Sequence, residues 1–129
     1  MTDWLLVGAG GFLGANLRHL TSIWAARRYG IAFPYGTLIV NLAGCLAMGM
    51  VMGGLAARTG NSDEARLLLA TGFLGGLTTF STFGFQTVEL IREGRTGAAL
   101  ANLLSSTTLG LAAVTAGLLA AWVVTDVLW

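Results

Sequence analysis

Four long apolar stretches, separated by short charged or glycine-containing segments, occupy almost all of this 129-residue chain. A membrane-spanning helix needs about 20 apolar residues to cross roughly 30 Å of hydrocarbon, and each stretch is long enough. The expected spans are residues 4–26, 34–57, 66–91 and 97–124. The pattern predicts an all-α integral membrane protein with a single four-helix transmembrane domain over residues 1–129.

The charge content excludes the main soluble alternatives. Only 10% of the residues are charged, against roughly 25% in an ordinary soluble domain, so polar groups could not cover the surface. A single cysteine, Cys45, excludes a disulfide-rich secreted scaffold. The sequence contains no nucleophile–base arrangement, no phosphate-binding loop and no cluster of transition-metal ligands. We therefore expect neither an enzyme nor a nucleic-acid-binding protein.

The arginine distribution does not fix an orientation in the membrane. All seven basic residues are arginines, and they favour the first and third loops only weakly. Those loops carry Arg27, Arg28, Arg92 and Arg95, and the opposite side carries Arg58 and Arg66. A chain that can insert both ways can form an antiparallel dimer. Four short helices alone have little interior for a polar path, so a transporting form is expected to be an oligomer.

Two features of the spans concern backbone packing. Glycines recur four residues apart, which is typical of closely packed membrane helices; the pairs are Gly10/Gly14, Gly49/Gly53 and Gly72/Gly76. Residues 72–83 place Gly-Gly and Thr-Thr at the centre of the third span, which is poor helix material. We expect a helix interruption near the bilayer midplane. It either binds an ion or is a simple kink whose hydroxyls bond back to the backbone.

Neutral hydrogen-bond donors lie inside the spans. Asn41 is at the centre of the second span, with Thr37 one turn earlier. The fourth span adds Asn102, Ser105, Ser106, Thr107 and Thr108. Singly, each is explained by hydrogen bonds between helices. As a set without a fixed carboxylate, they suit a small anion.

Two aromatic residues and one arginine within the spans can each have either a structural role or a role in binding an anion. Phe80 and Phe83 share a helix face; they either pack against neighbours or present positive ring edges to an anion. Arg18 is the only charge well inside the first span. It either extends to the membrane surface or contributes to an electropositive vestibule.

Three segments, residues 10–18, 36–44 and 72–83, resemble the CrcB/Fluc family of fluoride channels. The resemblance covers essentially the whole chain, and the Gly-Phe-Leu-Gly-Gly-Leu-Thr-Thr-Phe-Ser-Thr-Phe segment is its most specific part. It implies a dual-topology, antiparallel homodimer in the bacterial cytoplasmic (inner) membrane. Such a dimer has two pores and passively exports fluoride from the cytoplasm, which lowers its toxicity.

The resemblance also implies roles for individual residues. The implied pore residues are Thr37, Asn41, Phe80, Phe83 and Ser106, with Arg18 at the vestibule. A structural Na⁺ at the dimer axis is implied to bind the backbone carbonyls of Gly75 and Thr78 from each subunit, since four oxygens suit a hard cation. Two positions depart from the family pattern: Gln86 replaces a common glutamate, and Asn102 a common tyrosine.

Two other functions remain as alternatives. A small dual-topology multidrug exporter would need a carboxylate within the membrane, but Asp3 lies at the edge of the first span and Glu89 near the end of the third. A non-transporting structural membrane subunit would leave the interrupted helix and the polar residues unexplained.

Overall fold

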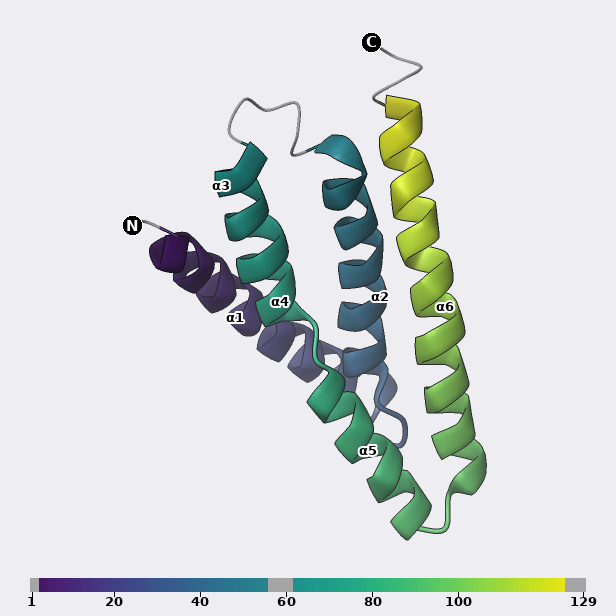
Figure 1. Cartoon of the computed structure of the whole chain (residues 1–129). Helices are drawn as coiled ribbons and strands as arrows, with labels where there is room; N and C mark the ends of the chain where they lie inside the picture. The colour runs from purple at the N-terminus through teal and green to yellow at the C-terminus, as the bar shows by residue number, and fades with distance from the viewer. Residues whose placement is uncertain (1–2, 56–61, 125–129) are drawn as a thin grey trace.

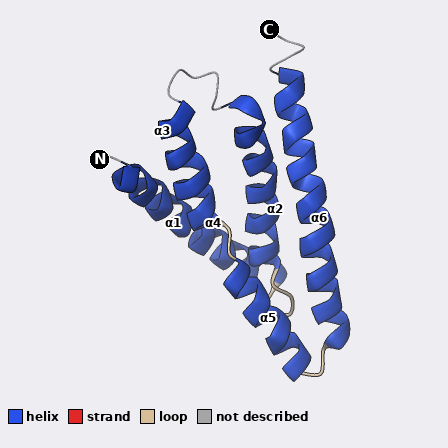
Figure 2. Cartoon of the chain, viewed as in Figure 1, coloured by secondary structure: helices blue, strands red, loops and turns tan. Residues whose placement is uncertain are grey.

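The computed structural model describes residues 3–55 and 62–124, and there the chain consists of helices joined by short connections (Figure 1, Figure 2). The described part forms four helical rods, which confirms the all-α fold. The first rod is α1 (Asp3–Tyr29), and the second is α2 (Tyr35–Met50), followed by η1 (Val51–Leu55), where the chain is kinked at Gly54 (φ 124°). The third contains α3 (Ser62–Arg66), η3 (Leu67–Leu74), α4 (Gly75–Leu77) and α5 (Phe80–Arg92), and the fourth is α6 (Thr96–Trp122).

Three of the rods are long and apolar enough to cross a membrane, namely Tyr35–Gly54, Asp63–Arg92 and Thr96–Trp122. α1 has 27 residues, or about 40 Å at 1.5 Å per residue, yet its sequence is less apolar than that of the other three rods. Its glycines and the polar run of Asn16, Arg18 and His19 dilute its apolar content. α1 also slants across the other rods (Figure 1). The predicted end of the second span at residue 57 and the loop arginine Arg58 lie outside the described residues.

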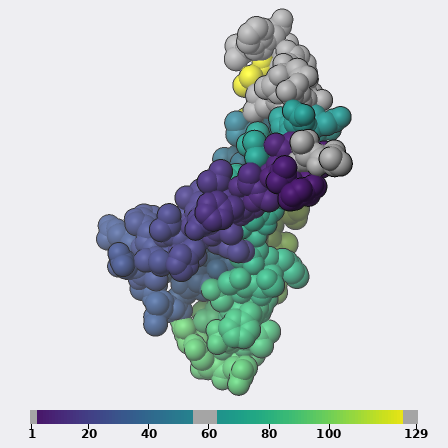
Figure 3. Space-filling model, turned by 90° about the vertical axis from the view of Figure 1, so that its left-hand side faces the viewer, coloured from purple at the N-terminus to yellow at the C-terminus, as the bar shows by residue number. Residues whose placement is uncertain are grey.

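The rods pack in two main pairs, which contact each other where α1 packs against α2 and where α5 packs against α6. α2 and α6 lie side by side, whereas α1 packs across η3 and α4. In the view of Figure 3, α1 crosses the face of the molecule, and the end of the protein formed by α5 projects below it. Between α2 and the third rod, Val40, Leu74 and Leu77 form a small buried apolar core.

Both helix crossings depend on glycine. A Cβ on Gly14 would collide with the backbone of Phe73, and a Cβ on Gly76 would lie 2.6 Å from the carbonyl oxygen of Gly11. At the other crossing, Gly49 faces Gly117, with only 3.0 Å between a Cβ on Gly49 and the Cα of Gly117. The close packing predicted from the glycine spacing is thus present.

The third rod is broken between α4 and α5, near the middle of its membrane-crossing length. Thr78 (φ −84°, ψ 156°) and Thr79 (φ −152°, ψ 115°) adopt extended backbone conformations. The interruption expected from the Gly-Gly-Leu-Thr-Thr run is therefore present. As a result, α5 is a separate helical segment of the third rod, and its position is not set by helix continuity with α4.

The glycine crossing between α1 and the third rod gives a stability prediction. Gly14→Val should destabilise the fold by roughly 1–3 kcal/mol, as overpacking does, because its side chain would meet the backbone of Phe73 and Leu77. Gly8→Val is the matched control on the same helix, since a Cβ there has no neighbour within 4 Å. Thermal unfolding in detergent measures both variants. An equal loss of stability in the two would contradict the packing argument.

Candidate functional site

The side chain of Asn41 bridges the break in the third rod. Its Oδ1 accepts a hydrogen bond from the amide of Thr79 at 2.9 Å, and its Nδ2 donates to the carbonyl of Thr79 at 3.3 Å. One side chain therefore satisfies both backbone polar groups of a residue that lies outside any helix. The amide nitrogen carries two hydrogens, so a second N–H remains that could be donated to a ligand.

Thr79 is the N-cap residue of α5. Its hydroxyl accepts from the amide of Thr82 at 3.3 Å, which is an N-cap contact. The same hydroxyl lies 3.0 Å from the hydroxyl of Thr82 and 3.3 Å from that of Ser81. The first turn of α5 thus places two hydroxyls, those of Ser81 and Thr82, around the buried hydroxyl of Thr79.

The two phenylalanines predicted to line a pore lie at the start of α5. Their ring centroids are 5.7 Å apart and the ring planes are inclined by 48°. Phe83 is 8% exposed, whereas Phe80 is 84% exposed in the single chain. One ring therefore belongs to the interior and the other to an outer surface beside the break.

A second polar link joins α5 to α6. Asn102 is fully buried, and its Nδ2 donates to the hydroxyl of Thr87 at 2.8 Å. That hydroxyl donates in turn to the carbonyl of Phe83 at 2.8 Å. The Oδ1 atom of Asn102 is buried without a hydrogen-bond partner among the described residues.

Ser106 differs from the neighbouring hydroxyl residues of α6. The hydroxyls of Ser105, Thr107, Thr108 and Thr115 all donate to carbonyls of their own helix. The Ser106 hydroxyl is buried, and within the described chain it has no partner. A buried unpaired hydroxyl is rare in native structures, so Ser106 is available to donate to a ligand.

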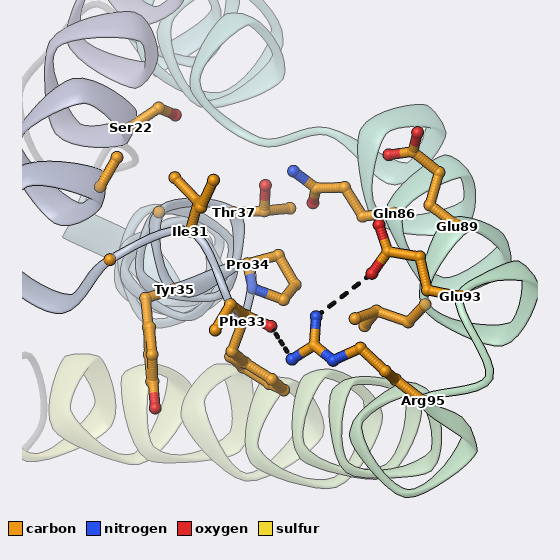
Figure 4. A pocket seen from close by; sticks show the side chains of 15 residues that line it. Ser22, Ile31, Phe33, Pro34, Tyr35, Thr37, Gln86, Glu89, Glu93 and Arg95 are labelled. Atoms are coloured by element: carbon orange, nitrogen blue, oxygen red, sulfur yellow. Dashed lines mark hydrogen bonds and ion pairs between the residues drawn. The ribbon is translucent and has the colours of Figure 1, made fainter.

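A pocket of about 220 Å³ opens at the end of the molecule where α1 meets α2 and α5 meets α6. Figure 4 shows Thr37 of α2 and Gln86 of α5 pointing toward one another across it. Thr37 is 5% exposed, and the Oε1 atom of Gln86 is buried without a partner among the described residues. Asn41 lies one turn beyond Thr37 on α2, so the deepest α2 residue of the pocket is one helical turn from the bridged break.

The mouth of the pocket carries charges of both signs. Arg95 donates to the carbonyl of Ala32 and lies 3.3 Å from a carboxylate oxygen of Glu93 (Figure 4). Glu89 also lines the pocket. Arg95 therefore connects the α1–α2 loop to the turn between α5 and α6.

The remaining predicted site residues lie apart from this group. Arg18 is half-buried on α1, and its carbonyl accepts from the Ser22 hydroxyl at 2.9 Å. Within the described chain, no hydrogen bond or ion pair joins the Arg18 guanidinium to the predicted pore residues. Arg18 therefore has no direct polar contact with the Asn41–Thr79 bridge.

Gly75 and Thr78 lie on the α4 side of the break, where backbone carbonyls lose their usual donors. The Thr79 amide, which would serve Gly75 in a continuous helix, donates to Asn41 instead. The Thr82 amide, which would serve Thr78, donates to the Thr79 hydroxyl. The described residues contain no group of three His, Cys, Asp or Glu side chains that could hold a metal ion, so a cation here would need backbone carbonyl oxygens.

The sequence profile of one family, described as "CrcB-like protein, Camphor Resistance (CrcB)", matches residues 5–118. The chain belongs to the CrcB-like family. Among curated relatives, the "Fluoride-specific ion channel FluC" of Roseiflexus sp. (strain RS-1) is 50% identical over 113 residues, 88% of this chain and 91% of that protein.

Two further relatives of this CrcB-like protein carry the same name. The protein of Chloroflexus aurantiacus (strain ATCC 29366 / DSM 635 / J-10-fl) is 44% identical over 117 residues, 91% of this chain and 93% of its own length. That of Rhizobium meliloti (strain 1021) is 45% identical over 118 residues, 92% of this chain and 94% of its own.

Three residues important to the site of this CrcB-like protein were missed from sequence. Thr79 could have been found, because a threonine directly before a helix start is a common N-cap. The hydroxyl of Thr87, four residues after Phe83, has the spacing for a bond to the preceding turn. Arg95 had no such signal, since its partner Ala32 lies 63 residues away.

The Asn41 bridge gives a second stability prediction. Asn41→Ala should destabilise the CrcB-like protein by roughly 1–3 kcal/mol, because it leaves both backbone groups of a part-buried Thr79 unpaired. Asn41→Asp should recover little, since a carboxylate accepts from the amide but cannot donate to the carbonyl.

The matched control is Asn16→Ala, which removes an exposed asparagine bonded only to its own helix. Thermal unfolding in detergent compares the three variants with the parent. A loss no larger for Asn41→Ala than for Asn16→Ala would show that the bridge does not stabilise the fold.

Proposed function

We infer that the chain is a fluoride-specific ion channel of the bacterial membrane, through which fluoride leaves the cytoplasm passively. The observation that carries this inference is 44–50% identity over about nine-tenths of the chain to three proteins named as fluoride-specific channels. A channel makes and breaks no covalent bonds, so the protein is not an enzyme.

The proposed path runs from the pocket to the broken helix and along the face shared by α5 and α6. Its donors are the Thr37 hydroxyl, the second N–H of Asn41 and the unpaired hydroxyl of Ser106. The rings of Phe80 and Phe83 offer positive edges at the start of α5. Fluoride is small and strongly hydrated, so several close donors must replace its water. A narrow path with such donors excludes the larger chloride.

Arg18 is proposed as a vestibule residue, where its charge would raise the local fluoride concentration. Its half-buried place on α1, apart from the hydrogen-bonded group, supports attraction at a distance more than direct coordination. α1 is proposed as the fourth membrane span, tilted because its 27 residues exceed the length that a perpendicular crossing needs.

The working unit is proposed to be an antiparallel, dual-topology homodimer in the cytoplasmic membrane. The weak arginine bias permits both insertions. The single chain also leaves a large apolar side chain, Phe80, 84% exposed beside the break. A second copy would cover this side chain and complete a site that one chain provides only in part.

A structural Na⁺ is proposed between the two breaks, held by the carbonyls of Gly75 and Thr78 from each subunit. The residues fit this ion, because the amides that would normally bond these carbonyls are engaged by Asn41 and by the Thr79 hydroxyl. Carbonyl oxygens are suitable ligands for a hard cation. When bound, the ion would supply positive charge that offsets the converging carbonyl dipoles.

Fluoride efflux from reconstituted vesicles tests the channel and its proposed pore residues. Phe80→Ile and Phe83→Ile should each abolish efflux while leaving the protein folded, and Ser106→Ala should lower it about tenfold by removing a donor. Ser105→Ala is the matched control, because its hydroxyl is already bonded to the helix backbone.

Chloride and a cationic dye serve as controls for transport. Dye movement without fluoride movement would favour the multidrug exporter, and movement of neither would favour the structural subunit. Undiminished fluoride efflux in both phenylalanine variants would remove them from the proposed pore.

Removing sodium tests the proposed dimer and its ion together. Exchange of Na⁺ for choline should lower the dimer fraction in detergent, measured by light scattering, and restored Na⁺ should recover it. An unchanged dimer fraction would contradict the ion site.

Glu93→Cys in a Cys45→Ser background tests dual topology. The new thiol should react with a membrane-impermeant reagent from both sides of the membrane, because the two subunits are inserted in opposite orientations. Labelling from one side only would contradict dual topology.

A further inference from the structure

We propose that Asn102 is a positioning residue that holds α5 in place through Thr87, and that this link sets how well the channel distinguishes fluoride from chloride. The proposal rests on the proposed function, because it concerns the selectivity of the fluoride path. It assigns Thr87 a role that was not apparent from the sequence.

The need for such a link follows from the broken helix. α5 begins after the extended residues Thr78 and Thr79, so α4 does not hold it through backbone hydrogen bonds. In the described chain, side-chain hydrogen bonds tie α5 and its N-cap to other helices at two points. Asn41 of α2 holds the N-cap residue Thr79, and Asn102 of α6 holds Thr87, two turns further along.

The directions of the hydrogen bonds make the second link specific. The Thr87 hydroxyl has one hydrogen, which it donates to the carbonyl of Phe83 at 2.8 Å, so it must accept from Asn102. This requirement fixes the orientation of the Asn102 amide, with Nδ2 toward Thr87 and Oδ1 away from it. The link therefore runs from α6 to the backbone of Phe83, a proposed pore residue.

The environment of the link makes it costly to break. Asn102 is completely buried, with 0% of its surface accessible to solvent. Removing the Thr87 hydroxyl would leave a buried amide N–H without a partner, and removing the Asn102 amide would leave the hydroxyl tied only to its own helix. In either case no side-chain hydrogen bond among the described residues would fix the distance between α6 and the middle of α5. A small displacement of Phe83, whose ring is 8% exposed, would widen the path.

Substitutions of the two linked residues provide the test. Thr87→Val removes the hydroxyl at nearly constant volume, and Thr87→Ser keeps it. Asn102→Leu removes the amide, and a Thr87→Val/Asn102→Leu double variant measures the coupling of the two residues. Thr115→Val is the matched control, because it removes an exposed hydroxyl that is bonded only within α6.

Fluoride and chloride efflux are measured separately from vesicles with matched amounts of protein, and their ratio is the readout. Thr87→Val and Asn102→Leu should each raise the chloride-to-fluoride ratio about tenfold, whereas Thr87→Ser and Thr115→Val should keep the parent value. The chloride-to-fluoride ratio of the double variant should be no higher than that of the more affected single variant, because each single substitution already removes the same link. A merely structural role would lower both fluxes together and leave their ratio unchanged.

The outcomes separate this inference from the channel function on which it rests. Fluoride efflux from the parent with an unchanged ratio in Thr87→Val and Asn102→Leu overturns the link alone, as does an additive double variant. No fluoride efflux from the parent overturns both proposals. If Asn102→Leu does not fold, the comparison of Thr87→Val with Thr87→Ser decides the question, because these variants keep Asn102.

Discussion

The arrangement of this protein depends on the pair of hydrogen bonds between the Asn41 side chain and the backbone of Thr79. A break in the middle of a membrane helix leaves amides and carbonyls that hydrocarbon cannot satisfy, and it persists only where protein supplies partners. Asn41 supplies both partners for the central residue of the break. Because the amide of Thr79 is engaged in this way, the carbonyl of Gly75 is left for another ligand.

Close glycine contacts provide the rigid frame around this break. α1 approaches the third rod at Gly72 and Gly76, just before the break. On the other side, a side chain at Gly44 would collide with the methyl group of Thr78, so glycine leaves room for that residue. The half of the third rod before the break is thus held by close glycine contacts on two sides. α5, after the break, depends instead on α6 and on two amide side chains.

This division explains what could be predicted from the sequence. The helical rods, the interruption and the glycine packing follow from local composition and short spacings, so they were predictable. The partner of Asn41 lies 38 residues away, that of Asn102 15 residues away, and that of Arg95 63 residues away. No local pattern reports such pairs, because each depends on the crossing of separate rods. The sequence predicted four equivalent spans, but α1 is less apolar than the other three rods and is not equivalent to them.

The hydrogen bonds from the break to α6 use only amides, hydroxyls and carbonyls, whereas the charges of the pocket lie at its mouth. Neutral groups inside and charged groups at the mouth suit an anion that must leave as readily as it enters. A full positive charge along the path would hold fluoride, and conduction requires binding that is favourable but weak. Neutral donors provide weak binding only if they are placed accurately, and here the same amides that could donate to the ion also hold the helices. The placement of Asn41 therefore determines both the shape of the break and one of the proposed donors, so the two properties cannot be changed independently.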